Sequence, residues 1–349
     1  MRLAATGLGA AFLFLSAACV THAPALPGPE IEPRITALQR EVLAALTGET
    51  DIRPGVKITN RFTIENKREA RTYLAAELSR IGLTPQRQSY GTESENVYAI
   101  LSCGRPGAEA VVFGAHYDSV RVAPGANDDG TGVVAVLATA RELAKTKGRT
   151  RDLIFVFFDE EERGLVGSRN FAQMLKDQNR LVHSVHTIDQ AGWDGNGNRA
   201  IELELPYDGA VALYKRAAAA LGMTMPIWET TETGSDHSSF RRLGFKAIGI
   251  TEEYRHNDTT PFIHKAGDTL ATINFPYLAS TTRLMIQVMT QLANDCPPSV
   301  ARSAGSACSC RARRPRGSGS SRGSCCPAPG RATGTRAPSA TAAVRAAWS

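Results

Sequence analysis

Residues 153–168 have the sequence LIFVFFDEEERGLVGS. The first six side chains are all apolar, and such a short, continuous apolar run is typical of a β-strand buried on both faces. Four consecutive carboxylates follow it directly, and residues 168–175 then show apolar side chains at helical spacing. A buried strand, a polar turn and an amphipathic helix form the repeating unit of α/β proteins.

The same alternation continues on both sides of this stretch. Short runs rich in Val, Ile and Phe predict four further strands, at 96–101, 110–115, 185–188 and 247–251. Amphipathic stretches predict helices before and between them, at 35–46, 68–81, 131–145, 168–175, 209–221 and 275–293. The expected fold class is therefore α/β, a three-layer sandwich with a central, largely parallel mixed sheet flanked by helices.

Polar residues that could ligate a metal follow the predicted strands. Ligands of such sheets bind beyond the carboxyl ends of the strands, so chemistry is expected there. Taken in chain order, the candidates are His116 and Asp118, Asp128 and Asp129, Asp159 to Glu162, Asp189, His264 and Asp268. Period-two alternation places His116 and Asp118 on one face, where Asp118 could accept the imidazole N–H.

Each of these residues alone has an ordinary structural explanation. Asp129 could cap the next helix, Asp189 could close a turn, and His264 could lie in a surface loop. Consecutive carboxylates repel one another, however, and the run from 159 to 162 follows an entirely apolar strand. A pair of cations, with Arg163 nearby, would relieve this repulsion. In a two-metal hydrolase one acid of such a run binds metal and a neighbour takes the proton from water.

Six ordered blocks join these residues into one pattern: GAHYDS, PGANDDGTG, DEEERGLVGS, TIDQAG, SDHSSF and HKAGDT. The pattern resembles the co-catalytic di-zinc aminopeptidases, the family of the secreted bacterial leucyl aminopeptidases, over about residues 68–292. The resemblance implies a zinc-exopeptidase fold, two Zn²⁺ ions as cofactors and hydrolysis of the N-terminal bond of peptides or proteins.

The resemblance also implies roles for individual residues. These are zinc ligation by His116 and Asp189 at one ion and by Glu162 and His264 at the other, a bridge by Asp128, general base catalysis by Glu161, and support of the ligands by Asp118, Asp129 and Asp268. The family also uses a non-proline cis peptide bond, which is expected here between Asp128 and Asp129.

Other positions near the site depart from the better-known relatives or lack a settled role. Ile263 stands where several relatives have a Tyr that could hydrogen-bond the oxyanion, so Tyr254 is a candidate for that duty. His237 is a candidate wall or hydrogen-bonding residue of the substrate site. Three further histidines have no matching role and are expected in surface or loop positions: His183, His186 and His256.

Three alternatives share part of this pattern. A glutaminyl cyclase has the same scaffold with one zinc ion, but Asp129 and the compact EERGLVGS segment argue against it. Related carboxypeptidases and dipeptidases keep the same metal ligands, so the ligands alone do not exclude them. A non-catalytic binding module would be expected to lose ligands or the base, and all of these positions are intact here.

The chain of 349 residues has a formal net charge of +6, which is distributed unevenly. Residues 297–349 contain nine arginines and no Lys, Asp or Glu, which leaves the first 296 residues at −3. Because this body carries no basic stripe, a nucleic-acid partner is not expected. The tail, rich in Arg, Ala, Gly, Ser and Pro, lacks the composition of a packed core, and is expected to be a disordered extension or an out-of-frame product.

The N-terminus predicts export. Arg2 precedes an uncharged apolar stretch, residues 3–19, that is too short to span a membrane and is typical of a secretory signal. The stretch ends in LSAAC, which resembles a bacterial lipobox, so Cys19 is a candidate lipid anchor. The protein is thus expected to be a cell-envelope lipoprotein or a secreted protein, and a monomer.

The expected domain organisation follows from these segments. It is an export segment at 1–19, a linker at 20–33, a single catalytic domain at 34–296 and the low-complexity tail at 297–349. Only Cys103 and Cys296 of the seven cysteines lie in the catalytic domain, so a disulfide scaffold is not expected.

Overall fold

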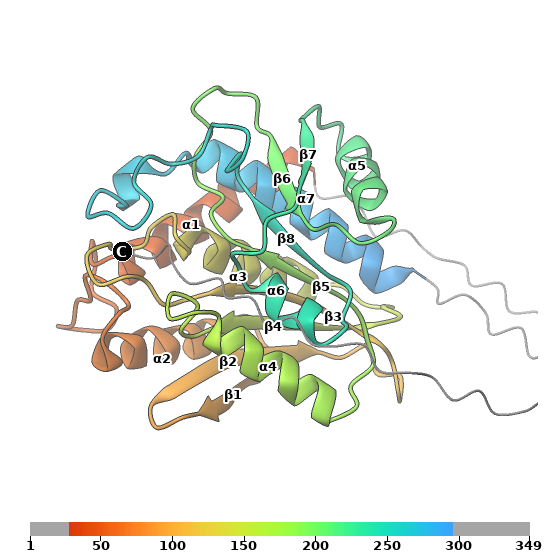
Figure 1. The fold of residues 1–349 in the computed structure, drawn as a ribbon, viewed down its shortest axis with the longest axis horizontal. Helices are drawn as coiled ribbons and strands as arrows, with labels where there is room; N and C mark the ends of the chain where they lie inside the picture. Colours follow the sequence, from red (N-terminus) through yellow and green to blue (C-terminus); the bar gives the residue numbers. More distant parts are fainter. Residues whose placement is uncertain (1–27, 296–349) are drawn as a thin grey trace, which may run out of the picture. The chain divides into compact units, whose positions relative to one another are not determined.

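The computed structural model describes residues 28–295, which form one sheet of eight strands with helices on both faces (Figure 1). The strands are β1 Pro85–Tyr90, β2 Ser94–Leu101, β3 Ala110–His116, β4 Asp152–Phe158, β5 Val182–Ile188, β6 Ile201–Glu204, β7 Ile227–Thr230 and β8 Ala247–Thr251. Their order across the sheet is β1-β2-β4-β3-β5-β8-β6-β7.

The four central strands, β4, β3, β5 and β8, run parallel to one another. β2 pairs antiparallel with β4, β6 pairs antiparallel with β8, and β1 and β7 form the two edges. Since the central strands are parallel, their carboxyl ends meet at one edge of the sheet. The prediction of an α/β fold with a largely parallel mixed sheet is confirmed.

Seven helices cover the sheet in the part of the chain that the structure describes. They are α1 Glu32–Leu46, α2 Ile64–Arg80, α3 Gly130–Ala144, α4 Val166–Asp177, α5 Ala210–Ala220, α6 His237–Arg242 and α7 Phe275–Asn294, with short 3₁₀ turns at Pro29–Ile31 and Leu270–Thr272. α4 and α6 pack on one face, and α1, α3, α5 and α7 form the layer on the other (Figure 1). α2 packs against β1 and β2.

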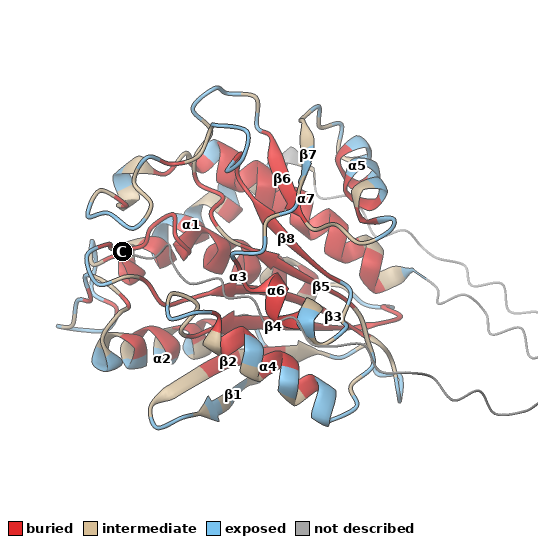
Figure 2. Cartoon of the chain, in the orientation of Figure 1, coloured by how far each residue is buried: buried red, intermediate tan, exposed pale blue. Residues whose placement is uncertain are grey.

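Alternation along the strands divides the core into two layers. In β4, Phe157 belongs to the core beneath α1, α3 and α7, whereas its neighbour Phe158 belongs to the core beneath α4 and α6. The Phe158 ring lies 5.8 Å from the ring of Phe171 on α4. Figure 2 shows the central strands buried, while the outer surfaces of α4 and α5 are exposed. The uninterrupted apolar run of β4 is therefore required because both of its faces are covered.

All five predicted strands and all six predicted helices are present, with bounds that differ by a few residues. β1, β6, β7 and α6 were not predicted. β1 has the sequence PQRQSY, and its strand conformation comes from pairing with β2 rather than from an apolar pattern. β6 and β7 have four residues each and α6 has six, so they are too short to show a period.

Two expectations need correction. α1 begins at Glu32, inside the expected linker, because Ile31 is buried in the core and Pro33 fits the first turn of a helix. His186 is fully buried in β5 with its Nδ1 2.9 Å from the Tyr214 hydroxyl, so a surface position is wrong for this residue. His183 is half-buried at the start of β5.

Several expectations lie outside the described residues. These are the export segment 1–19, the candidate anchor Cys19, and the tail 297–349. Within residues 28–295, no helix combines the length and the apolar character needed to cross a membrane.

Candidate metal centre

The expected ligands gather at the carboxyl edge of the sheet. β3 ends at His116, Asp189 follows the last residue of β5, and Asp128 lies in the loop that leads into α3. One ligand atom each of His116, Asp128 and Asp189 lie within 4.8 Å of one another, and the same is true of Asp128, Glu162 and His264. The five predicted ligands therefore form two triads that share Asp128.

The shared carboxylate of Asp128 faces a histidine with each of its oxygens. Oδ1 lies 3.3 Å from Nε2 of His116, and Oδ2 lies 3.1 Å from Nε2 of His264. Nε2 of His264 is also 3.0 Å from Glu162, and Nε2 of His116 is 3.7 Å from Asp189. Hydrogen bonds to Asp128 and Glu162 raise the pKa of His264 to about 10. Attraction between histidine and carboxylate thus holds the two triads together.

The triads have the chemistry of a metal site. Within residues 28–295, the buried triad atoms without a hydrogen-bond partner include Nε2 of His116, Oε1 of Glu162 and Oδ1 of Asp189. Leaving such groups unsatisfied typically costs about 1–3 kcal/mol each, and a cation would engage their lone pairs. Imidazole nitrogens combined with carboxylate oxygens suit zinc. The residues present therefore fit one such ion at each triad.

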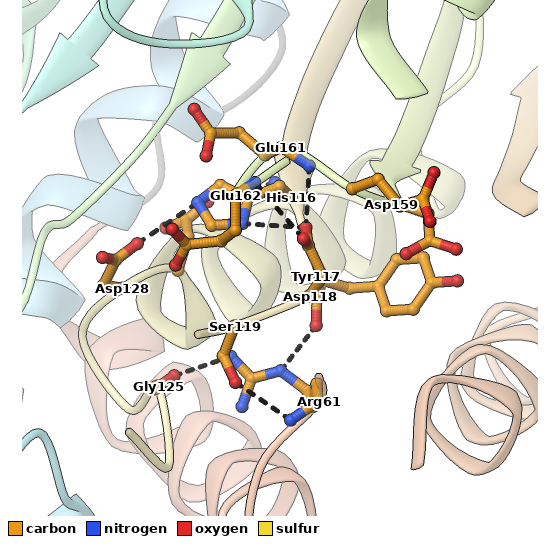
Figure 3. Close-up of polar contacts among 12 residues, drawn as sticks. Arg61, His116, Tyr117, Asp118, Ser119, Gly125, Asp128, Asp159, Glu161 and Glu162 are labelled. Atoms are coloured by element: carbon orange, nitrogen blue, oxygen red, sulfur yellow. Dashed lines mark hydrogen bonds and ion pairs between the residues drawn. The ribbon is translucent and has the colours of Figure 1, made fainter. Parts of the chain in front are cut away.

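Asp118 connects the first triad to the acidic turn after β4. Its Oδ1 lies 3.3 Å from Nδ1 of His116. The same carboxylate accepts the backbone N–H groups of Glu161 at 3.0 Å and Glu162 at 3.3 Å, as Figure 3 shows for Glu161. One buried side chain thus contacts both an imidazole and the backbone of two acids, so it can fix their relative positions.

Asp268 and Asp129 hold the loop that carries Asp128. The Asp268 carboxylate accepts the backbone N–H groups of Asn127 at 2.7 Å and Asp128 at 3.1 Å. Asp129 caps α3 through the N–H of Gly132 and also accepts the N–H groups of His116 and Gln190. The Asp128–Asp129 peptide bond is cis, as predicted. Both carboxylates therefore support the ligands through backbone contacts.

The four acids of the run 159–162 are separated by the fold. Lys67 on α2 lies 2.9 Å from Asp159 and 3.1 Å from Glu160, and its side chain is only 2% exposed. Arg163 lies 3.2 Å from Glu160. Repulsion within the first two acids is therefore relieved by Lys67, with help from Arg163, and only Glu162 belongs to a triad. Nothing near Lys67 in the sequence marks it for this role, because its partners are more than ninety residues away.

Glu161 is half-buried beside the first triad. Burial raises the pKa of its carboxyl, and the charges of Asp189 and Asp236 act in the same direction, against His116. Asp236 itself was not singled out from the sequence, although it stands in the SDHSSF block. It is fully buried, burial raises its pKa to about 7, and its Oδ1 has no hydrogen-bond partner in residues 28–295.

Neither of the two candidate substrate-site residues forms a hydrogen bond or ion pair with a triad residue within residues 28–295. His237 is fully buried, with Nε2 3.0 Å from the carbonyl oxygen of Glu232 and Nδ1 3.4 Å from Glu204. Tyr254 is 37% exposed, and the guanidinium of Arg255 lies 5.3 Å from its ring centre. His237 thus hydrogen-bonds the backbone of Glu232, and the roles suggested for His237 and Tyr254 in the substrate site stay predictions.

Comparison with known families decides the relationship. A family model described as Peptidase family M28 matches residues 96–289. The chain belongs to peptidase family M28. This membership confirms the resemblance carried by the six sequence blocks, and with it the prediction of a metallopeptidase.

Individual proteins resemble this M28 peptidase in sequence or in fold. A probable leucine aminopeptidase of Arthroderma otae is 28% identical over 290 residues, which cover 75% of each chain. The LapA aminopeptidase of Legionella pneumophila superposes with a TM-score of 0.65 at 22% identity, covering 76% of each chain. The zinc aminopeptidase BSAP of Bacillus subtilis gives 0.54 at 23% identity, over 58% of this chain and 50% of its own.

A glutaminyl cyclase also shares the fold. The enzyme of Porphyromonas gingivalis superposes with a TM-score of 0.59 at 19% identity, over 75% of this chain and 98% of the cyclase. The scaffold alone therefore does not separate a peptidase from a cyclase, and the separation depends on the site.

Proposed function

We propose that this M28 peptidase is a di-zinc aminopeptidase that removes residues from peptide N-termini, with Glu161 as the general base. The observation that carries the proposal is Asp128, whose two oxygens each face a different histidine within a different triad. A single-metal enzyme has no need for such a shared carboxylate. From the N-terminal sequence we also propose that the protein is exported.

The residues for two ions are in place. His116 and Asp189 would hold one zinc, Glu162 and His264 would hold the other, and Asp128 would contact both. When bound, such ions lower the pKa of a water molecule and polarise the scissile carbonyl.

Glu161 performs the proton transfers in this proposal. Its carboxylate takes a proton from the attacking water and then delivers it to the nitrogen of the leaving amine. Burial raises the pKa of Glu161 toward the working pH, the range in which a carboxylate is an effective general base. Asp118 keeps Glu161 and Glu162 at a fixed separation by accepting both of their N–H groups.

The acidic surroundings also explain a preference for a free N-terminus. The carboxylates of Asp189, Glu161 and Asp236 lie close enough for their charges to influence one another. A substrate ammonium group placed among them would be attracted, whereas a blocked N-terminus would gain nothing from these charges. Attack is then limited to the first peptide bond.

The alternative function is a single-zinc glutaminyl cyclase, favoured by the match over nearly the whole cyclase chain. Zinc content and product identity separate the two. Two zinc ions per chain and chelator-sensitive release of N-terminal residues from aminoacyl chromogenic substrates are expected. One zinc ion and pyroglutamate formation from an N-terminal glutaminyl peptide would assign the cyclase. No zinc and no turnover would assign a binding module.

Substitution of the base provides the sharpest test of mechanism. Glu161→Gln is expected to lower kcat by about 10²–10⁴-fold, because general base catalysis is lost, while zinc content stays near that of the wild type. Glu65→Gln on the exposed surface of α2 is the control and should leave both values unchanged. Unchanged turnover in Glu161→Gln would remove this residue from the mechanism.

A further inference from the structure

Two buried cations lie beneath the site, and both come from one short segment. Arg61 is completely buried just before α2, and Lys67 is 2% exposed in the first turns of that helix. Lysine and arginine are almost never fully buried unless their charges are compensated, so each requires a reason to be there. The contacts of the two side chains differ, and each serves a different part of the site.

Arg61 holds the loop between the ligands His116 and Asp128. Its guanidinium donates to the carbonyl oxygens of Tyr117 at 2.5 Å, Pro124 at 2.6 Å and Gly125 at 2.7 Å. Figure 3 shows Arg61 below Tyr117 and beside Ser119 and Gly125. The contacted residues begin immediately after His116 and end three residues before Asp128, so Arg61 fixes both ends of the loop.

Two neighbours shape the loop around the guanidinium. The Ser119 hydroxyl accepts the backbone N–H of Arg61 at 2.9 Å and donates to the carbonyl of Ala123 at 3.2 Å. Gly125 has a φ of +72°, and a Cβ there would lie 2.6 Å from Nη2 of Arg61. The loop thus leaves space for the guanidinium and for nothing larger than glycine at position 125.

The charge of Arg61 is balanced at longer range. No carboxylate lies within ion-pair distance of it in residues 28–295, and its close acceptors are neutral carbonyls. The carboxylates that attract it electrostatically are Asp268, Asp118, Asp129 and Asp128. These are the shared ligand and its supports, so the cation offsets the negative charge concentrated around the triads.

Lys67 holds the turn that leads to the base. Its ammonium group lies between Asp159 and Glu160, and Asp159 also accepts the backbone N–H of Glu95 at 3.3 Å. Glu160 has a backbone φ of +59°, which residues other than glycine rarely adopt unless neighbouring contacts stabilise it. Glu161 is the next residue, so any movement of this turn displaces its carboxyl directly.

We propose that Arg61 and Lys67 are positioning residues with separate duties: Arg61 sets the affinity for the metal through the loop 117–125, and Lys67 sets turnover through the turn that aims Glu161. This inference rests on the proposed function. It assigns neither residue a contact with substrate or metal.

The test compares Arg61→Met with Lys67→Met, using two readouts. Zinc affinity is measured on the metal-free proteins by competition with a chelating dye, and kcat and KM are measured at saturating zinc. Arg61→Met is expected to weaken zinc binding by about 10–100-fold, with kcat within about threefold of the wild type once zinc is saturating. Lys67→Met is expected to keep zinc affinity within about threefold while kcat falls by about 10–100-fold at unchanged KM.

Controls match each change in chemistry and location. Arg53→Met and Arg68→Met remove exposed arginines, each of which pairs with a surface glutamate, and neither should change affinity or turnover. Lys67→Arg keeps the charge and should recover part of kcat. Arg61→Lys keeps the charge but loses the forked geometry, and should weaken zinc binding less than Arg61→Met does. These two conservative variants also carry the test if either Met variant does not fold.

The outcomes separate the inference from the function on which it rests. If the wild type binds zinc and turns over, but both substitutions lower affinity and kcat together, the separate duties are wrong and the two residues support the fold alone. If zinc affinity, kcat and KM are all unchanged in one of the two variants, that residue has no positioning role. If the wild type neither binds zinc nor hydrolyses peptides, the proposed function fails and the inference fails with it.

Discussion

Gly167 shows how closely the acidic turn is packed at the scale of a single residue. A Cβ at this position would collide with the backbone carbonyl of Asp159 and would lie 2.6 Å from Oδ1 of Asn96. Asn96 in turn links the two segments, since it accepts the N–H of Asp159 and donates to the carbonyl of Gly167. One methyl group would therefore push the turn that carries Glu161.

Gly167→Ala is expected to destabilise the protein by about 1–3 kcal/mol and to lower kcat, because rigid backbone must move to admit the methyl group. Urea unfolding and steady-state kinetics measure the two effects. Gly234→Ala is the matched control, since a Cβ there meets nothing within 4 Å. Wild-type stability in Gly167→Ala would show that the turn can yield, and would contradict the tight packing.

His116, Glu162 and Asp189 could be predicted from the sequence because they stand at or just after strand ends. Asp128 and His264 lie in loops, and only the ordered sequence blocks that contain them marked them as ligands. The supporting residues show the limit of that reasoning. Arg61 contacts the carbonyl of a residue 56 positions away in the sequence, and Lys67 contacts a carboxylate 93 positions away. In addition, a lysine in an amphipathic helix normally points to solvent. Asp236 follows no strand directly, so its approach to Glu161 depends on how α6 packs. Burial of a charged residue is decided by tertiary contacts that no local pattern contains.

At the scale of the element, β5 combines a ligand-bearing end with a buried histidine in its middle. The ring nitrogens of His186 form hydrogen bonds with the hydroxyl groups of Tyr214 and Ser184. Burial lowers the pKa of His186 to about 3. Because an unfolded histidine titrates near 6.5, the unfolded chain binds this proton at a higher pH than the folded chain does. The stability associated with neutral His186 is thus complete above pH 6.5 and is lost as the pH falls toward 3.

His186→Phe is expected to flatten the plot of unfolding free energy against pH between about pH 3 and 6.5. The reduction in slope corresponds to about one proton fewer taken up on unfolding. The full effect is on the order of 5 kcal/mol across that window. Urea unfolding at a series of pH values measures it as the difference between variant and wild type. Phe113→Leu on the neighbouring strand β3, whose position pairs with His186 in the sheet, removes no titratable group and should retain the wild-type slope. Equal slopes in His186→Phe and the wild type would mean that folding does not change the pKa of His186.

The burial of each strand explains which strands could be predicted from the sequence. Strands β3, β4 and β8 are mostly apolar because helices cover both of their faces, so their own sequences identify them. β5, with the sequence VHSVHTI, shows this pattern only in its last residues. β1 is a polar edge strand, and β6 places two glutamates among apolar residues. Pairing with a neighbour creates these strands, and the neighbour is not visible in a local window.

At the scale of the whole molecule, the folded sheet brings several negatively charged residues from distant parts of the sequence close together. Asp128, Glu162 and Asp189 lie close together, and bound cations would relieve their repulsion. Ligands that bind only the folded state stabilise it, by about 2.7 kcal/mol at a free concentration of one hundred times Kd. Metal content and folding stability are therefore linked.

Removal of zinc with a chelator is expected to lower Tm by roughly 5–10 °C for a domain of this size. Thermal unfolding with and without chelator, followed by addition of zinc, measures the shift and its reversal. Asp128→Asn lacks the shared carboxylate charge, so its Tm should respond much less to either treatment. A wild-type Tm that is insensitive to chelation would argue against occupied metal sites.

The order of the strands has a kinetic consequence. β5 and β8 are neighbours in the sheet although β6 and β7 separate them in sequence, and the triads draw on segments from His116 to His264. Pairings between distant segments form slowly, because the intervening chain must first be ordered. Peptidase activity should thus return late in refolding, after most helical circular dichroism has recovered. Recovery of turnover would then report the time at which the strands of the sheet have all paired.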